Sequence, residues 1–194
     1  VGILLIASIV FYAFSSPWLT LLLLASAIFT SWSSYEINQA DTAKKRKIIA
    51  CVGVMLNIFV LVFFKYAGLL VRSLENLTGA SLSGAEWLVM LPLPIGISFY
   101  TFQGISMLID TFRDSRNSQE ASEVYRSGQS LGESLYYGSF YVIFFPQLVA
   151  GPVVKAKDFF PYIKVKSISQ INWRLVTHSL ALGFFLKSVI ANNF

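Results

Sequence analysis

The chain has 194 residues, of which 55% are hydrophobic and only 13% are charged. Soluble domains are less apolar and carry about 25% charged residues, so the composition excludes an ordinary soluble domain and predicts a membrane protein. The net charge of +5 comes from basic clusters between apolar runs, which is typical of cytoplasmic membrane loops and does not indicate a nucleic-acid partner. Cys51 is the single cysteine, so neither an internal disulfide nor a cysteine-based metal site is expected.

The first half of the sequence predicts three apolar helices. Residues 1–14 are apolar but shorter than the about 20 residues that a spanning helix needs. Residues 18–35 and 48–70 are long enough to cross a bilayer. The basic cluster from Lys44 to Lys47 lies between them, and the positive-inside rule places it in the cytoplasm. We expect residues 72–86 to form a loop on the other side.

The fourth apolar run, residues 87–112, contains more polar positions than a plain membrane span. Gln103 lies among small and hydroxylated residues, which let helices approach closely and hydrogen-bond to one another. Asp110 and Arg113 are three residues apart on one helical face, so their spacing allows a salt bridge. An interfacial ion pair without a further role is the simpler interpretation of these two. A mixed-charge cytoplasmic loop is expected to follow, over residues 113–129.

The next run, residues 136–152, is short and is broken by proline. It carries the uncharged polar side chain of Gln147 and ends in Gly151-Pro152. Irregular backbone among apolar residues is tolerated only where protein or a water-lined cavity surrounds it. A full crossing would leave five basic residues outside, starting at Lys155, and the positive-inside rule disfavours that arrangement. We therefore expect a re-entrant segment, with a tilted full crossing as the alternative.

The last apolar run, residues 175–194, predicts a further helix with His178 near its start and Lys187 deeper inside. Interfacial hydrogen bonding is the simpler account of the histidine. Because both ends of the sequence lie in apolar runs, we expect one membrane domain, residues 1–194, that is part of a longer protein. Its N-terminal spans lie in residues 1–72 and its motif-bearing region in residues 87–194.

Residue patterns alone leave the function open. The sequence shows no identifiable Ser-His-carboxylate arrangement, P-loop, dinucleotide-binding glycine motif or zinc signature. The patterns predict an all-α, polytopic transmembrane helical bundle with a polar path inside it. A transporter with a broken helix and a membrane-embedded enzyme both fit that description.

Three blocks of the sequence resemble the signature of a known protein family. They are LPLPIGISFYTFQ at residues 91–103, which continues to LIDTFR at 108–113, FFPQLVAGP at 144–152, and GFFLKSVIANN at 183–193. In this order and spacing they resemble signature blocks of the membrane-bound O-acyltransferases, most closely the alginate O-acetyltransferase branch. Two positions depart from that pattern, since Asn192 stands where the family often has Asp and Lys155 where it often has Arg.

The resemblance implies acyl transfer inside a bacterial cytoplasmic (inner) membrane by a multi-pass protein. An acetyl group would pass from a cytoplasmic donor, acetyl-CoA, toward an exported polysaccharide such as alginate, with an extracytoplasmic acyltransferase as partner. D-alanyl transfer to teichoic acid is an alternative, but that branch has a different proline block. A non-enzymatic transporter or channel is the alternative outside the family. No bound cofactor and no metal are expected.

The resemblance also implies where the chemistry lies. The family's essential histidine belongs to a motif expected beyond Phe194, so no catalytic residue is assigned in this chain, which alone should be inactive. Candidate residues of the substrate path are Gln103, Asp110, Arg113, Gln147, Gly151, Pro152 and Lys155. In this scheme Gln147 orients a carbonyl or hydroxyl, Gly151 permits close backbone approach, and Lys155 meets an anionic donor. Alternatively, Gln147 bonds a free carbonyl of the broken helix, and Gly151-Pro152 only ends it.

Overall fold

The computed structural model describes residues 1–79, 90, 92–114, 130–151, 154–160, 163, 169 and 171–191. Throughout these ranges the regular structure is helical and no strand occurs. The chain divides into two compact units, Val1–Ile163 and Lys164–Phe194, which are described separately.

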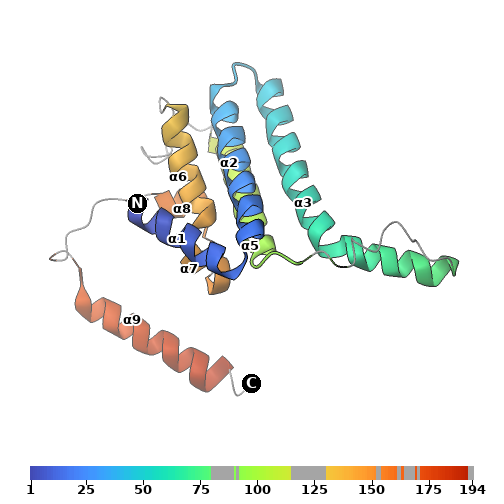
Figure 1. Cartoon of the computed structure of the whole chain (residues 1–194). Coiled ribbons are helices and arrows are strands. Elements are labelled where there is room, and N and C mark those ends of the chain that lie inside the picture. The colour runs from blue at the N-terminus through green and yellow to red at the C-terminus, as the bar shows by residue number, and fades with distance from the viewer. Residues whose placement is uncertain are drawn as a thin grey trace. The chain divides into compact units, whose positions relative to one another are not determined.

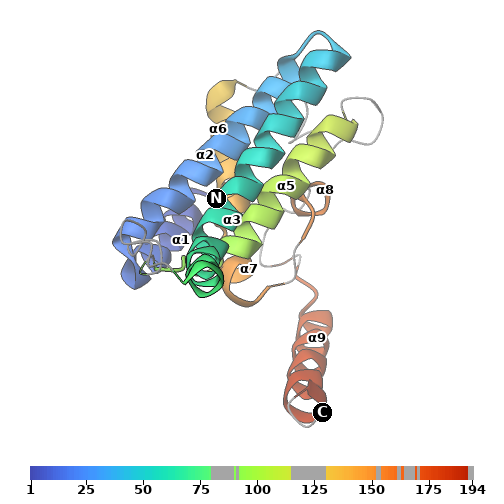
Figure 2. The same cartoon turned by 90° about the vertical axis from the view of Figure 1, so that its right-hand side faces the viewer.

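The first unit is a bundle built around α2, Pro17–Gln39. This helix packs against α3 (Ala43–Thr78), α5 (Ile97–Asp114) and α6 (Leu131–Ile143). Figures 1 and 2 show these helices running side by side, with consecutive helices in opposite directions. The turn between α2 and α3 therefore lies at the same end of the bundle as the end of α5 and the start of α6.

Small residues explain why α2 can take the central position. Its buried positions include Ala27 and a series of hydroxylated residues, namely Thr20, Thr30, Ser31, Ser33 and Ser34. Gly138 of α6 faces this surface so closely that a Cβ there would lie 2.5 Å from Ser31 Oγ. Helix packing in membranes depends on such small residues, because lipid supplies no hydrophobic drive for helices to associate.

Among the described residues, three helices are long and apolar enough to cross a membrane: α2, α3 and the helix over Trp173–Ala191. The prediction of an all-α, polytopic membrane protein is therefore confirmed. The apolar helix α1, Gly2–Ser15, is shorter than a span, as expected. The predicted spans over residues 18–35 and 48–70 lie inside α2 and α3.

Two predicted boundaries are wrong. The loop expected from Arg72 onward is helical up to Thr78, and α3 ends only at Gly79, whose φ of 66° forms a left-handed cap. The helix expected over residues 87–112 is not helical at residues 92–96, where two prolines prevent continuous helical hydrogen bonding. That chain segment has no regular structure at residues 92–94, turns at Ile95-Gly96, and enters α5 only at Ile97.

The proline-broken segment folds back on itself. Helix α6 stops at Ile143, Phe144 leaves the helical region, and the short helix α7, Phe145–Ala150, begins with a proline in its first turn. The chain then returns along α6 as α8, Ala156–Phe159, and the Tyr141 hydroxyl donates a hydrogen bond of 2.7 Å to the Val154 carbonyl. Rings of α6 and the returning chain pack together, at Phe140, Tyr141, Phe144, Phe159 and Phe160. Residues 136–151 are therefore not one continuous helix, and the expected re-entrant course through the membrane stays a prediction.

The second unit contains the last apolar run. Helix α9, Trp173–Phe185, starts two residues before the predicted boundary and is capped by Asn172, whose side chain accepts from the Leu175 amide at 3.1 Å. It continues as a π-helical turn, Leu186–Ala191. His178 and Lys187 are exposed along this helix.

Candidate functional site

The candidate site is centred on two glutamines that come from different sequence blocks. Gln103 of α5 donates a hydrogen bond from Nε2 to Oε1 of Gln147 in α7, at 2.6 Å and across 44 positions of sequence. Gln103 is 1% exposed and Gln147 is 9% exposed. The two polar side chains that stood out in apolar sequence are therefore partners inside the bundle.

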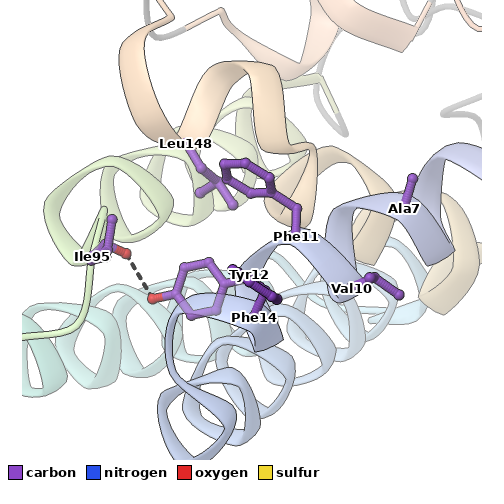
Figure 3. A pocket seen from close by; sticks show the side chains of 7 residues that line it. All are labelled: Ala7, Val10, Phe11, Tyr12, Phe14, Ile95 and Leu148. Carbon is purple, nitrogen blue, oxygen red and sulfur yellow. Dashed lines mark hydrogen bonds between the residues drawn. The ribbon is translucent and has the colours of Figure 1, made fainter.

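Gly96 allows the sequence block at residues 91–113 to meet the block at residues 144–152. Its φ is 72°, in the left-handed region that favours glycine, and a Cβ at this position would lie 2.8 Å from the Leu148 carbonyl oxygen. The chain before α5 therefore lies directly against α7. Tyr12 of α1 fixes the same junction, because its hydroxyl donates to the Ile95 carbonyl at 2.7 Å (Figure 3).

An apolar recess of about 570 Å³ opens beside this junction. Figure 3 shows side chains of α1 and Ile95 and Leu148 around it, and the full lining is Ala7, Val10, Phe11, Tyr12, Phe14, Ile95 and Leu148. Leu148 directly follows Gln147, so the recess and the glutamine pair share the wall formed by α7. A recess of this lining suits hydrocarbon and not charged groups.

Two polar atoms near the pair stand out among the described residues. Gln103 Oε1 and the Tyr100 hydroxyl are both buried and have no hydrogen-bond partner within that part of the chain. A buried polar group without a partner costs about 1–3 kcal/mol, and such groups in native proteins need an explanation. The two lie three residues apart, on the same face of α5.

Other buried polar side chains of the bundle hydrogen-bond to neighbouring helices and serve packing. Asn57 Nδ2 donates to the Gly53 carbonyl at 2.9 Å and to Thr30 Oγ1 at 3.3 Å. Ser34 and Thr111 hydroxyls lie 2.8 Å apart. These bonds join α2 to α3 and to α5, so the polar interior predicted from sequence is partly structural.

Asp110 and Arg113 do not join the glutamine pair. Asp110 is half-buried in the last turns of α5 and interacts electrostatically with Tyr141 of α6. Arg113 is exposed. Within residues 92–114 no ion pair is found between them. Their predicted salt bridge is thus not formed in the described structure.

The remaining candidates follow Gln147 along the chain. A Cβ on Gly151 would lie 2.7 Å from Gln147 Cα, so the close backbone approach expected of this glycine is made to its own helix α7. Lys155 is exposed and is the N-cap residue of α8. Pro152 lies outside the described residues.

The position of α8 along α6 indicates how far its charged residues lie from the end of the bundle. Tyr141, which binds the Val154 carbonyl, lies ten residues after the start of α6, about 15 Å along the helix. Lys155, Lys157 and Asp158 follow that carbonyl in the chain and are exposed. Charged side chains at such depth face protein or water-filled cavities and not lipid. We therefore expect these exposed charged side chains to meet protein or water and not lipid.

Sequence reasoning missed the tyrosines of the site. Tyr12 and Tyr141 hold the junction and the fold-back through hydroxyl-to-carbonyl bonds, and Tyr100 places its hydroxyl in the core. Tyrosine in an apolar run is ordinary, so no local signal marks these three. No group of three His, Cys, Asp or Glu that could hold a metal ion occurs in the described ranges.

The chain is similar to named bacterial acetyltransferases. It is 33% identical to a peptidoglycan O-acetyltransferase of Helicobacter pylori over 205 aligned residues, which cover 98% of this chain and 38% of that protein. It is 36% identical to the Pseudomonas aeruginosa protein named "Probable alginate O-acetylase AlgI" over 80% of this chain and 28% of that protein. The AlgI protein of Azotobacter vinelandii is 33% identical over 92% of this chain and 31% of that protein.

These similarities cover most of this chain but only part of its relatives. The chain spans about a third of the length of the curated relatives it matches. No family model matches it, and no solved structure matches it. The relatives carry the kinds of name that the three sequence blocks led us to expect, and the similarity extends well beyond those blocks. The chain is thus a homologue of proteins named peptidoglycan O-acetyltransferase and alginate O-acetylase, in agreement with its resemblance to the membrane-bound O-acyltransferases.

Proposed function

We propose that the complete protein is a membrane-embedded O-acyltransferase that moves acetyl groups toward an exported polysaccharide. The observation that carries this proposal is the similarity, at 33–36% identity over 80–98% of the chain, to proteins named as O-acetyltransferases or O-acetylases. Their names cite peptidoglycan and alginate, so the acceptor class is a cell-envelope or exported glycan. D-alanyl transfer and simple transport have no similar support.

Within that function the described chain supplies a wall of the acyl-transfer path. Gln147 is held by Gln103 at the junction of the two signature blocks, next to an apolar recess. An amide N–H can donate to the carbonyl of an acyl group, and an apolar surrounding strengthens that bond because water does not compete. A general base for the acceptor hydroxyl would come from outside this chain, as the family resemblance implies.

Lys155 is proposed to meet the acyl donor. It is exposed at the N-cap of α8 and directly follows Val154, whose carbonyl accepts from Tyr141 of α6, so its charge falls at a depth where charge indicates function. The expected donor is acetyl-CoA, whose phosphates are anionic and are attracted by a lysine. The location is the bacterial inner membrane, with the basic end of the bundle at Lys44–Lys47 toward the cytoplasm. An acyltransferase partner outside that membrane would complete delivery to the polymer.

The decisive experiment uses the complete protein in a strain that lacks its own copy. Ester-linked acetate on the exported polymer is measured for the native protein, for Gln147→Ala, and for Lys155→Ala. We expect acetylation with the native protein, a large loss with Gln147→Ala, and a raised KM for acetyl-CoA with Lys155→Ala in membrane vesicles.

Lys157→Ala is the matched control, because Lys157 is also an exposed lysine but lies two residues further along the chain, within α8. Its KM should stay close to the native value, while protein levels remain equal for all variants. A native protein that adds no acetate to any envelope or exported glycan would contradict the proposed function. Native activity with unchanged Gln147→Ala and Lys155→Ala variants would instead contradict only the roles given to these residues.

A further inference from the structure

Helix α3 is longer than a membrane crossing requires. Its 36 residues correspond to about 54 Å, whereas the hydrocarbon core of a bilayer is about 30 Å thick. The basic cluster in its first turns places one interface close to Ile48, and about 20 residues beyond that point complete the crossing. The helix nevertheless continues to Thr78. Its last part, residues 65–78, is called here the distal segment.

The distal segment does not follow the bundle. In Figure 1 the first part of α3 runs alongside α2, and the green end of the helix then turns aside and runs across the bundle direction. Figure 2 shows the same end almost along its axis, which agrees with that course. A helix that leaves the spanning direction where the crossing is complete would lie along the membrane surface.

The distal segment is amphipathic at helical spacing. One face carries four large side chains at intervals of four, four and three residues: Tyr66, Leu70, Leu74 and Leu77. The opposite face carries Lys65, Arg72, Glu75 and Asn76, together with one apolar residue, Leu69, which is 61% exposed. The first part of α3, from Ile48 to Phe64, has a single polar side chain, Asn57, and no charge. The surface of α3 is therefore apolar on all sides up to Phe64 and becomes amphipathic where the helix changes direction.

The apolar face is not covered by the described part of the chain. Leu70 is 53% exposed, Leu74 is 50% exposed and Leu77 is 84% exposed. At the start of the segment the Lys65 ammonium lies over the Tyr66 ring, 5.5 Å from its centre. Tyrosine is enriched at the depth of the lipid headgroups, because its ring is apolar and its hydroxyl is polar. A lysine next to it can bury its long stem there and still bring its ammonium group to water.

We propose that the distal segment lies flat in the headgroup–acyl boundary of the bilayer, with the leucine face turned into the acyl chains. Amphipathic helices of this kind bury their apolar face about 5–10 Å into that boundary. The occupant of the face is lipid and not another protein surface, because the segment directly continues a helix whose exposed side chains already face the bilayer. It would tie the end of α3 to the plane of the membrane.

The test is a nitroxide scan of the complete protein in liposomes, in a background without native cysteines. Single cysteines replace Leu74, Leu77 and Asn76 in turn, and Met55 provides a lipid-facing reference on the spanning part of α3. Collision rates with oxygen and with a neutral nickel chelate separate three surroundings: lipid favours oxygen, water favours nickel, and packed protein excludes both. Because all three distal side chains are exposed, the label needs no room inside the bundle.

We expect labels at Leu74 and Leu77 to collide with oxygen and not with nickel, at a shallower depth than Met55. The label at Asn76 should collide with nickel. Low collision rates with both reagents at Leu74 and Leu77 would show that protein covers the face, and high nickel rates would place it in water. Either result overturns the proposal, and neither depends on whether the protein transfers acetyl groups.

Discussion

Replacing Gln103 by methionine removes one hydrogen-bond donor from the interior while keeping the side-chain length. Gln103 Nε2 is the donor to Gln147 Oε1 at 2.6 Å, and both residues are at least nine-tenths buried. If Gln103 works by holding the Gln147 amide in one orientation, its loss should reduce acetyl transfer through Gln147 alone. If it only helps the bundle to fold, its loss should be felt whatever residue stands at position 147.

The size of the effect follows from the burial. A buried amide oxygen that loses its donor is left about 1–3 kcal/mol less stable. The middle of that range, about 2 kcal/mol, corresponds to about a 30-fold loss in kcat/KM when the misplaced group acts in the transition state. Gln147→Met removes the acting group itself and should cost at least as much.

A double-mutant cycle in the complete protein separates the two explanations. Initial rates of acetyl transfer from acetyl-CoA are measured in membrane vesicles for the native protein, both single variants and the double variant. We expect Gln103→Met to lower kcat/KM about 30-fold in the native background and to have almost no effect in the Gln147→Met background. Met107→Leu is the matched control, since Met107 is equally buried on α5 and carries no hydrogen-bonding amide.

The same loss from Gln103→Met in both backgrounds would refute a positioning role for Gln103. Thermal unfolding of the four proteins in detergent completes the comparison, because a purely structural role should lower the melting temperature in parallel with activity. An unchanged rate for Gln103→Met in the native background would show that the hydrogen bond has no part in the reaction.

Two further predictions concern the backbone conformation at Gly96 and the hydrogen bond by which Tyr141 holds the returning chain. Gly96→Ala and Gly79→Ala both force alanine into positive φ, which costs about 1–2 kcal/mol, but only position 96 also meets the backbone of α7. Gly96→Ala should therefore lower the melting temperature more than Gly79→Ala, and equal shifts would contradict the close contact. Tyr141→Phe removes the hydroxyl that holds the fold-back and should destabilise the protein by about 1 kcal/mol, whereas Tyr136→Phe, at an exposed position, should leave unfolding in detergent unchanged.

The fold class and the interruption at Pro146 could be read from the sequence, whereas the break at residues 92–96 could not. Apolar runs of sufficient length predict spanning helices whatever their partners, and Pro146 predicts a break because it cannot continue a helix from the preceding turn. The end of α3 was not predicted correctly, because the residues after Arg72 look polar enough for a loop. Their leucines recur at helical spacing, and that periodicity was the available signal.

The glutamine pair could be predicted only in part. Each glutamine is conspicuous in an apolar run, since a polar side chain there must find a partner. Which partner it finds depends on where α7 lies relative to α5, and that depends on the positive φ of Gly96 and the fold-back held by Tyr141. Such tertiary contacts leave no periodic trace in the sequence. The ion pair expected of Asp110 and Arg113 is the opposite case, because spacing along one helix allowed it and the surroundings of the two side chains did not produce it.

The arrangement of the two signature blocks also explains why their glycines and prolines accompany the glutamines. A buried amide pair is useful for orienting a substrate only if both backbones are held within a few tenths of an ångström. Gly96 and Gly151 remove side chains at points where a Cβ would lie 2.8 Å and 2.7 Å from backbone atoms of α7. Each glycine therefore sets the position of the helix that carries Gln147, one from outside the helix and one from its end. A substitution at either glycine should accordingly disturb acetyl transfer through Gln147, even though neither residue has a side chain that could touch a substrate.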